Sequence, residues 1–406
     1  MFNRKAFFAI FFSVIVLFSL AKAQDDPNIT VNELKGHIYF LAADSLLGRK
    51  PGTPQSYLVA DYIRSEFKKN GLKLLGEDGF QPFEVVTDVE AGSGNSLTFG
   101  DFSGTLSKDF VPLAFSANKS VTAPVVFVGY GFDFDDDSLA WHDYEGVDVS
   151  GKWCLILRGD PEQESEKSPY LNYTSLRKKV LVARDHNAAG VLFVSGKKYD
   201  SKDELLDLYF DKSTSDAGIS VLQIKRSVAN SLLKKSGETI ASLEKKLIDT
   251  KKPHSFSVDE EVSATTEIVK KISRAKNVVA LLPGNDPVLK DEYIIVGAHY
   301  DHLGMGGPGS GSRRPDTIAV HNGADDNASG VAAVLEIAEK LASERKKMKR
   351  SIIAMTFDAE EMGTLGSKYF VNHPLVDLKK VKYMFNLDMV GRLREEEKQS
   401  LTIGGT

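Results

Sequence analysis

The sequence predicts an α/β protein with a mostly parallel mixed sheet sandwiched by helices, interrupted by an inserted β-rich α+β module. Three observations lead to this prediction. After residue 276, apolar strand-like runs alternate with helical patterns, which is typical of a largely parallel sheet covered on both faces. Short β-type runs dominate residues 100–250. Apolar residues at helical spacing characterise the stretch before them.

Composition limits the class of protein. The chain has 406 residues, of which 42% are hydrophobic and 26% charged, enough for two or three domains with their own cores. The formal net charge of −5 gives no basic excess for nucleic-acid binding, so we expect no nucleic-acid partner. The single cysteine, Cys154, cannot form an internal disulfide, and its apolar surroundings favour a buried strand thiol.

The N-terminus has the three parts of a secretory signal peptide. Arg4 and Lys5 precede the apolar run 6–20, and the small-x-small sequence 21–23 follows it. The run is too short to span a bilayer comfortably. We therefore expect cleavage after Ala23 and a secreted or periplasmic protein without a membrane span. An uncleaved anchor is the alternative.

The predicted domain boundaries lie where the sequence pattern changes between helix-like and strand-like segments. Residues 24–105 begin the main domain, with helical patterns at 31–42 and 56–70 on either side of a loop rich in Pro and Gly. Residues 106–258 form the inserted module, with strands expected at 123–128, 152–157 and 190–194, and helices at 175–187 and 227–248. Residues 259–406 continue the main domain, with strands expected at 278–282, 293–298, 351–357 and 381–387, and helices at 329–342 and 365–372.

Acidic and histidine side chains follow three of these last strands. They are His299 and Asp301; Asp358, Glu360 and Glu361; and Asp388, while Asp325 and Asp326 precede a helix. Parallel strands carry such groups to one edge of a sheet, where ligands bind. So many acids would repel one another unless a cation lies among them. The mixture of His, Asp and Glu suits zinc, with other borderline divalent metals as alternatives.

Spacing separates the roles within this set. His299 and Asp301 are two residues apart in extended chain and therefore point the same way, so Asp301 can fix the imidazole tautomer. Glu360 and Glu361 are adjacent and diverge, so one can bind metal while the other takes a proton from water.

Four motifs resemble one known family. VGAHYDHLG, NGADDNASG, FDAEEMGTLGS and NLDMVGR resemble the co-catalytic di-zinc aminopeptidase family, which is related to bacterial leucyl aminopeptidases and to glutamate carboxypeptidase. The segments DVSGKWCLILRGDP and ARDHNAAGVLFVSG resemble a protease-associated domain. The resemblance implies a zinc-exopeptidase-like fold. It also implies a zinc-dependent exopeptidase, most simply an aminopeptidase that hydrolyses N-terminal bonds of peptides or proteins with water activated by two zinc ions.

Residue roles carry over from the same resemblance. It implies that Asp326 bridges both metals before a cis peptide bond, that His299 and Asp388 complete one zinc, and that Glu361 binds the other. Glu360 would be the general base and acid, and Asp301 would orient His299. The family supplies a further histidine after the last of these motifs, whereas no histidine follows His373 in this sequence, which we interpret as an incomplete peptidase domain.

Other readings of the same residues stay open. A carboxypeptidase or dipeptidase on the same fold has the same motifs, and a non-catalytic binding protein could retain the fold. His302 fits either an exposed loop residue or a contact to substrate or to a metal's outer shell. The sequence does not predict the preferred side chain or the oligomeric state.

Overall fold

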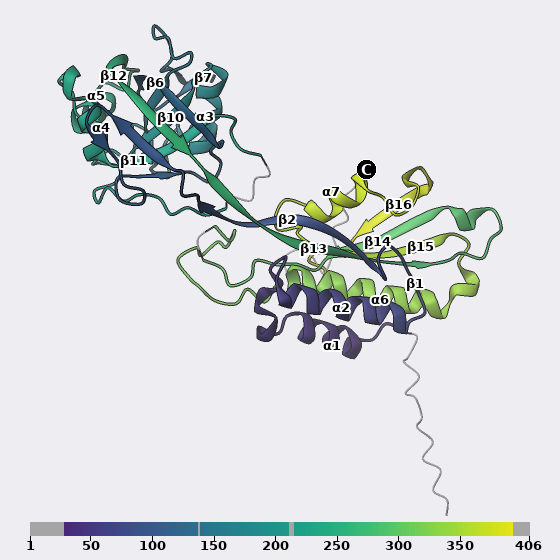
Figure 1. The fold of residues 1–406 in the computed structure, drawn as a ribbon. Coiled ribbons are helices and arrows are strands. Elements are labelled where there is room, and N and C mark those ends of the chain that lie inside the picture. Colours follow the sequence, from purple (N-terminus) through teal and green to yellow (C-terminus); the bar gives the residue numbers. More distant parts are fainter. Residues whose placement is uncertain (1–27, 137–138, 211–214, 308, 393–406) are drawn as a thin grey trace, which may run out of the picture.

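Two large β-sheets, connected by a long two-stranded ribbon, organise the protein (Figure 1). The computed structural model describes residues 28–136, 139–210, 215–307 and 309–392. The predicted signal peptide lies outside these residues. Within them, no helix combines the length and the apolar character needed to cross a bilayer.

The first sheet belongs to the main domain. Its strands are β1 Lys73–Leu74, β2 Phe80–Ala91, β13 Ile268–Leu282, β14 Tyr293–His299, β15 Ser351–Phe357 and β16 Val381–Asn386. Their order is β1-β13-β15-β14-β16, and β2 also pairs with β13. The mixed α/β architecture predicted from sequence is confirmed.

Fewer strand pairs of this sheet are parallel than the sequence predicted. β14 runs parallel to β15 and β16, but β13 is antiparallel to β1, β2 and β15. The prediction of a mostly parallel sheet therefore needs correction at β13. The apolar run 278–282 fits a strand buried on both faces in either direction, so the pattern alone could not fix its orientation.

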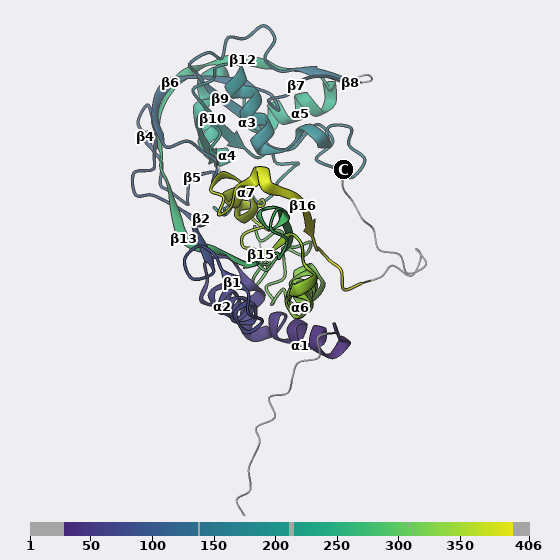
Figure 2. The ribbon, with the colours of Figure 1, turned by 90° about the vertical axis from the view of Figure 1, so that its right-hand side faces the viewer.

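Helices cover both faces of this sheet (Figure 2). α1 Val31–Leu41, α2 Pro54–Lys69 and α6 Gly330–Ser343 lie on one face, and α7 Leu365–Asn372 lies on the other. Successive side chains of a strand point to opposite faces of the sheet, so each strand contributes residues to the hydrophobic cores on both faces. On β15, Ile352 packs with α2 and α6, whereas Ile353 packs with Phe370 of α7.

The second sheet forms the inserted module. Its order is β4-β3-β12-β6-β9-β10-β11-β5, with β3 Ser96–Phe99, β4 Phe102–Ser103, β5 Phe110–Pro112, β6 Lys119–Val128, β9 Trp153–Leu157, β10 Gly190–Val194, β11 Ser220–Ile224 and β12 Ser255–Thr266. Its helices are α3 Leu176–Asp185, α4 Arg226–Leu232 and α5 Ile240–Thr250, and β7 Asp133–Asp136 pairs with β8 Leu139–His142. This sheet draws β3, β4 and part of β12 from outside the predicted range 106–258.

One predicted helix of the module is interrupted by a turn. The helix expected at 227–248 is two helices, α4 and α5, separated by a turn in which Gly237 adopts φ of 71°. Thr239 then starts α5, because its side chain accepts the Ser242 amide and forms a capping box. A pattern of apolar spacing runs across such a turn without showing it.

Shorter helical turns complete the structure. They are Asp44–Arg49, Leu171–Tyr173, Lys234–Ser236, Leu289–Asp291, Arg345–Lys347 and Leu378–Lys380, with a π-type turn at Ala324–Ser329. Strands β14, β15 and β16 end at the same edge of the sheet. His299 of β14 pairs with Phe357 of β15, and Gly297 of β14 pairs with Asn386 of β16. The loops after these strands therefore start from one edge of the sheet.

Candidate metal centre

A first group of potential metal ligands combines one histidine and two aspartates. His299 ends β14, Asp388 follows β16, and Asp326 precedes α6. His299 Nε2 lies 3.2 Å from Asp326 Oδ1 and 3.6 Å from Asp388 Oδ1. One ligand atom from each residue falls within 4.8 Å of the others, and His299 is buried. Three segments far apart in sequence thus converge on one point.

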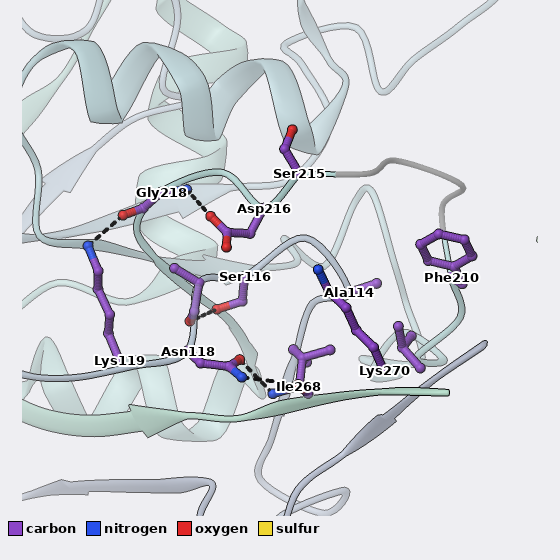
Figure 3. Close-up of a pocket in the computed structure, with 12 residues that line it drawn as sticks. Ala114, Ser116, Asn118, Lys119, Phe210, Ser215, Asp216, Gly218, Ile268 and Lys270 are labelled. Carbon is purple, nitrogen blue, oxygen red and sulfur yellow. Dashed lines mark hydrogen bonds between the residues drawn. The ribbon is translucent and has the colours of Figure 1, made fainter. Parts of the chain in front are cut away.

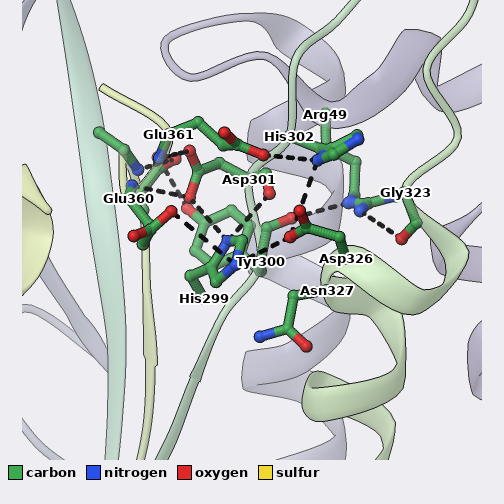
Figure 4. A network of polar contacts seen from close by, with 12 residues as sticks. Arg49, His299, Tyr300, Asp301, His302, Gly323, Asp326, Asn327, Glu360 and Glu361 are labelled. Atoms are coloured by element: carbon green, nitrogen blue, oxygen red, sulfur yellow. Dashed lines mark hydrogen bonds and ion pairs between the residues drawn. The ribbon is translucent and has the colours of Figure 1, made fainter. Parts of the chain in front are cut away.

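A second group shares Asp326 with the first (Figure 4). It contains His302, Asp326 and Glu361, again with one ligand atom of each within 4.8 Å of the others. His302 Nδ1 lies 2.7 Å from Glu361 Oε1 and 4.0 Å from Asp326 Oδ1. The His302 residue is only 8% exposed, so the interpretation of it as an exposed loop residue is wrong. The two groups could each hold one divalent cation, with Asp326 between them.

Asp301 lies between His299 and the two glutamates (Figure 4). Its carboxylate is fully buried, accepts the Glu360 amide at 2.9 Å and the Glu361 amide at 3.1 Å, and lies 3.5 Å from His299 Nδ1. One side chain therefore fixes the turn that carries both glutamates and also contacts the ring of His299.

Glu360 belongs to neither group. Its Oε2 is 3.9 Å from His299 Nε2, and its side chain is 37% exposed. It lines a cavity of about 130 Å³ together with His299 and Asp388. Burial raises the pKa of Glu360, the charge of His299 opposes this, and the nearby carboxylates, Asp301 first, reinforce it. A carboxylate in this position can accept a proton at the metal centre without being a ligand.

Asp358 turns away from the centre. It is fully buried and accepts hydrogen bonds from the hydroxyls of Tyr300 at 2.9 Å and Ser56 at 3.2 Å, and from the Lys276 amide at 3.2 Å. Burial, followed by the charge of Asp301, raises its pKa to about 7. Asp358 ties β15 to α2 and β13, and it lies in neither ligand group.

The turn before α6 anchors the segment that carries Asp388. Asn327 donates to the Leu387 carbonyl at 2.9 Å and accepts the Met389 amide at 3.3 Å. Asp325 accepts the Gly391 amide at 3.0 Å. The Asp326–Asn327 peptide bond is cis, as the resemblance implies. Adjacent residues therefore have separate roles. Asp325 and Asn327 bind the backbone of the segment around Asp388, whereas the Asp326 carboxylate faces His299 and His302.

Arg49 was not predicted as part of the site. Its guanidinium is buried and donates to the carbonyls of Leu41, Tyr300, Asn322 and Gly323 at 2.5 to 2.9 Å (Figure 4). Burial lowers its pKa to about 10, and Asp301 and Asp326 oppose the shift. The side chain joins the loops on which His302 and Asp326 stand. The sequence showed only a loop rich in Gly and Pro at this point.

We expect Arg49→Met to lower the free energy of unfolding by about 3–5 kcal/mol, because four carbonyls and nearby carboxylates would lose a buried cationic partner. Urea denaturation followed by circular dichroism measures this change. Arg313→Met, at an exposed loop position, is the matched control and should cost less than about 0.5 kcal/mol. A loss below about 1 kcal/mol for Arg49→Met would show that the guanidinium does not organise these loops.

His299 carries a proton when no cation is bound. Burial disfavours its charged form, but hydrogen bonds to Asp301, Asp326 and Asp388 outweigh burial and raise its pKa to about 12. A metal ion that binds this imidazole must displace that proton. Because the pKa is raised, the competing proton is held throughout the neutral range and metal affinity rises with pH.

We therefore expect metal affinity at the first group to increase about tenfold per pH unit between about pH 6 and 9, with about one proton released per ion. Calorimetric zinc titrations in buffers of different ionisation enthalpy measure the proton count. An affinity that does not change with pH, with no proton released, would contradict the charged state of His299.

The donor chemistry of the two groups fits divalent cations. Each offers an imidazole nitrogen and carboxylates, the ligand mixture that zinc prefers. Among the described residues, His302 Nδ1 and Glu361 Oε1 are buried atoms without a hydrogen-bond partner. The carboxylates of Asp326, Glu361 and Asp388 carry three negative charges, which two dications more than neutralise.

Two further cavities bear on where a substrate could bind. One of about 340 Å³ is lined by His302 and Glu361, by the apolar residues Leu303, Met305 and Met362, and by Tyr209 and Phe210 of the module. Another of about 440 Å³ lies between Asn118, Asp216 and Ile268, near the junction of module and ribbon (Figure 3). None of the predicted site residues lines the second cavity, whereas Glu361 lines the first, beside the smaller cavity lined by His299, Glu360 and Asp388.

Comparison with known proteins finds a family match in the C-terminal part of the chain. Residues 277–405 match peptidase family M28. The chain is 28% identical over 274 residues to aminopeptidase YwaD of Bacillus subtilis, covering 67% of this chain and 45% of that protein. It is 26% identical over 350 residues to an aminopeptidase of Pseudomonas aeruginosa, covering 84% and 54%.

Two further similarities complete the comparison. Leucine aminopeptidase 1 of Trichophyton equinum is 35% identical over 123 residues, 29% of this chain and 30% of that protein. The solved aminopeptidase of Aneurinibacillus sp. strain AM-1 is 24% identical, with a TM-score of 0.47 over 89% of this chain and 70% of that one. The chain spans about half the length of the Bacillus and Pseudomonas relatives. The match to peptidase family M28 covers residues 277–405, the part of the chain that carries both ligand groups.

Proposed function

We propose that the protein is a zinc-dependent aminopeptidase that holds two zinc ions. The observation that carries this proposal is the pair of ligand groups that share Asp326, with Glu360 beside them but in neither. His299, Asp326 and Asp388 would hold one ion, and Asp326 with Glu361 would hold the other. Two such ions, when bound, lower the pKa of water and polarise a carbonyl group.

The protein's own residues then divide the proton transfers. Glu360 takes a proton from the attacking water as the oxygen–carbon bond forms, and gives it to the departing amine nitrogen as the peptide bond breaks. Its pKa is raised by burial, which suits a group that both accepts and donates near neutral pH. Asp301 orients His299 and fixes the backbone amides of both glutamates.

The surroundings favour a free amino terminus as substrate. The carboxylates at the centre attract a cationic α-amino group. The neighbouring cavity of about 340 Å³ has apolar walls that can bury one side chain. The relatives named above are aminopeptidases, which agrees with this substrate class.

A direct assay separates this function from its nearest rival. The zinc-loaded full-length protein should hydrolyse leucine p-nitroanilide and leave an N-acetylated dipeptide uncut. Chelation should abolish the reaction, and added zinc should restore it. Cleavage of the N-acetylated dipeptide alone would indicate a carboxypeptidase or dipeptidase. Zinc binding without hydrolysis of either substrate would contradict an enzymatic role.

We further propose that the module predicted at 106–258 is a protease-associated domain inserted into a peptidase domain formed by 24–105 and 259–406. Its separate sheet between β2 and β13 supports this division. Export as a secreted or periplasmic protein rests on the signal-peptide pattern. Sequencing of the mature N-terminus should find Gln24 first.

A further inference from the structure

We propose that one edge of the main sheet binds a membrane surface with negatively charged lipid headgroups. Three segments form this surface, which we name the basic edge: 286–292, 344–350 and 377–382, directly before β14, β15 and β16. They contain nine basic and five acidic side chains, which leaves a net charge of +4. The whole chain has a net charge of −5, so positive charge is concentrated at this edge.

Backbone and side-chain contacts hold the three segments together. The Ser351 amide donates to the Glu292 carbonyl at 3.0 Å, and the Ser351 hydroxyl donates to the Lys290 carbonyl at 2.5 Å. The Glu292 carboxylate lies 2.7 Å from Arg350 Nε and 3.4 Å from Lys382 Nζ, so one acid contacts both other segments. The basic edge is therefore a continuous surface formed by segments far apart in sequence.

Much of the positive charge at the basic edge is exposed and unpaired. Salt bridges to Glu344 or Glu292 engage Lys347, Arg350 and Lys382. The remaining lysines are exposed and form no salt bridge to a described residue: Lys290, Lys346, Lys349, Lys379 and Lys380. Clusters of about four to eight such cations are typical of surfaces that bind anionic lipid headgroups. Charges more than about 10 Å away are largely screened at about 0.1 M salt, so the charge of the edge outweighs that of the whole chain.

An exposed apolar residue at the basic edge favours a lipid surface over a soluble polyanion. Val288 is 76% exposed, and Pro287 before it is exposed as well. Both precede the short helical turn Leu289–Asp291, which contains Lys290. An apolar side chain among cations can enter the boundary between headgroups and acyl chains, whereas a soluble polyanion offers it no apolar environment.

The basic edge lies at the opposite end of the strands from the metal centre (Figure 1). β14 starts beside the edge, where Tyr293 pairs with Ser351, and ends at His299 of the first ligand group. A strand of seven residues spans about 20 Å. A molecule bound through the basic edge therefore turns its metal centre away from the lipid, toward peptides in solution.

Sedimentation of the full-length protein with lipid vesicles tests this inference. Vesicles of phosphatidylcholine and phosphatidylglycerol in equal parts should carry the protein down, and vesicles of phosphatidylcholine alone should not. Binding should weaken by more than about tenfold when salt is raised from about 0.1 to about 1 M, because the Debye length falls from about 10 to about 3 Å.

Reversal of four charges at the basic edge should raise the dissociation constant for the anionic vesicles more than about 100-fold, since each cation near such a surface contributes about fivefold. The changes are Lys346→Glu, Lys349→Glu, Lys379→Glu and Lys380→Glu in one protein. The matched control reverses four exposed lysines of the inserted module that form no salt bridge to a described residue: Lys108→Glu, Lys167→Glu, Lys234→Glu and Lys252→Glu. It changes the net charge by the same amount and should bind vesicles as the wild type does.

Equal weakening in both fourfold variants would overturn the inference, because net charge and not the basic edge would then control binding. Binding to soluble heparin without binding to anionic vesicles would also overturn it, in favour of a polymeric polyanion. Val288→Ser keeps the test decisive if the fourfold variant at the edge does not fold. It should weaken vesicle binding by about tenfold through the loss of buried methyl groups, and unchanged binding would contradict a lipid surface.

Leucine p-nitroanilide turnover should be the same in all these variants, because none of the changed residues belongs to a ligand group or lines a cavity beside the metal centre. Lipid binding and peptidase activity are therefore read from separate measurements. A failure of one leaves the other untouched.

Discussion

Glu360→Gln lowers kcat of the zinc-loaded protein by about 10²- to 10⁴-fold and leaves its metal content unchanged; this is the expected result of removing a general base that is not a ligand. Glutamine keeps the size of the side chain but cannot accept the proton from water. The 3.9 Å separation from His299 Nε2 and the absence of Glu360 from both ligand groups motivate the prediction. Zinc content by mass spectrometry and turnover of leucine p-nitroanilide measure the two effects.

Glu361→Gln is the informative comparison, because it changes the adjacent glutamate in the same way. Glu361 belongs to the second ligand group, so this variant should lose metal along with activity. The contrast between neighbouring residues separates proton transfer from metal binding. Unchanged turnover in Glu360→Gln would remove Glu360 from the role of base, and loss of zinc from it would place Glu360 among the ligands.

Asp326→Ala should weaken both metal positions together. Its carboxylate belongs to both ligand groups, so its removal takes the shared ligand from each. The affinity for both ions should fall by more than about 100-fold, the upper end of the effect of residues that only support ligands. Calorimetric titration with zinc measures both affinities in one experiment, and peptidase activity should fall to background.

Asp325→Asn provides the control for this variant. Asp325 accepts the Gly391 amide at 3.0 Å, and asparagine keeps an oxygen that can accept the same hydrogen bond. We expect zinc binding of Asp325→Asn to stay within about threefold of the wild type, because a neutral acceptor replaces a charged one outside the ligand groups. If Asp326→Ala lost only one of two ions, Asp326 would not be shared.

The strands that carry the centre could be predicted from the sequence because they are mostly apolar and are bounded by polar residues. The runs at 293–298, 351–357 and 381–387 match β14, β15 and β16 within one residue. β2 and the first half of β13 were missed. Their buried and exposed residues alternate irregularly around a bulge near Lys271, and their length comes from pairing with each other across the ribbon. Such long-range pairing leaves little trace in a single local window.

Part of the metal centre could be predicted from the sequence. His299, Asp326, Glu361 and Asp388 stand in motifs, and the structure brings them together. His302 was harder, because it follows the strand end, where the two-residue periodicity of a strand no longer tells which way a side chain points. Arg49 was harder still, since all its partners are backbone carbonyls and these have no sequence signature.

Diffraction from a zinc-soaked crystal, recorded on both sides of the zinc absorption edge, tests most directly whether the acidic side chains at this sheet edge are gathered by divalent cations. We predict two anomalous peaks, one among His299, Asp326 and Asp388 and one beside Asp326 and Glu361. A map without a peak at either position, with the same carboxylates still clustered, would contradict the account.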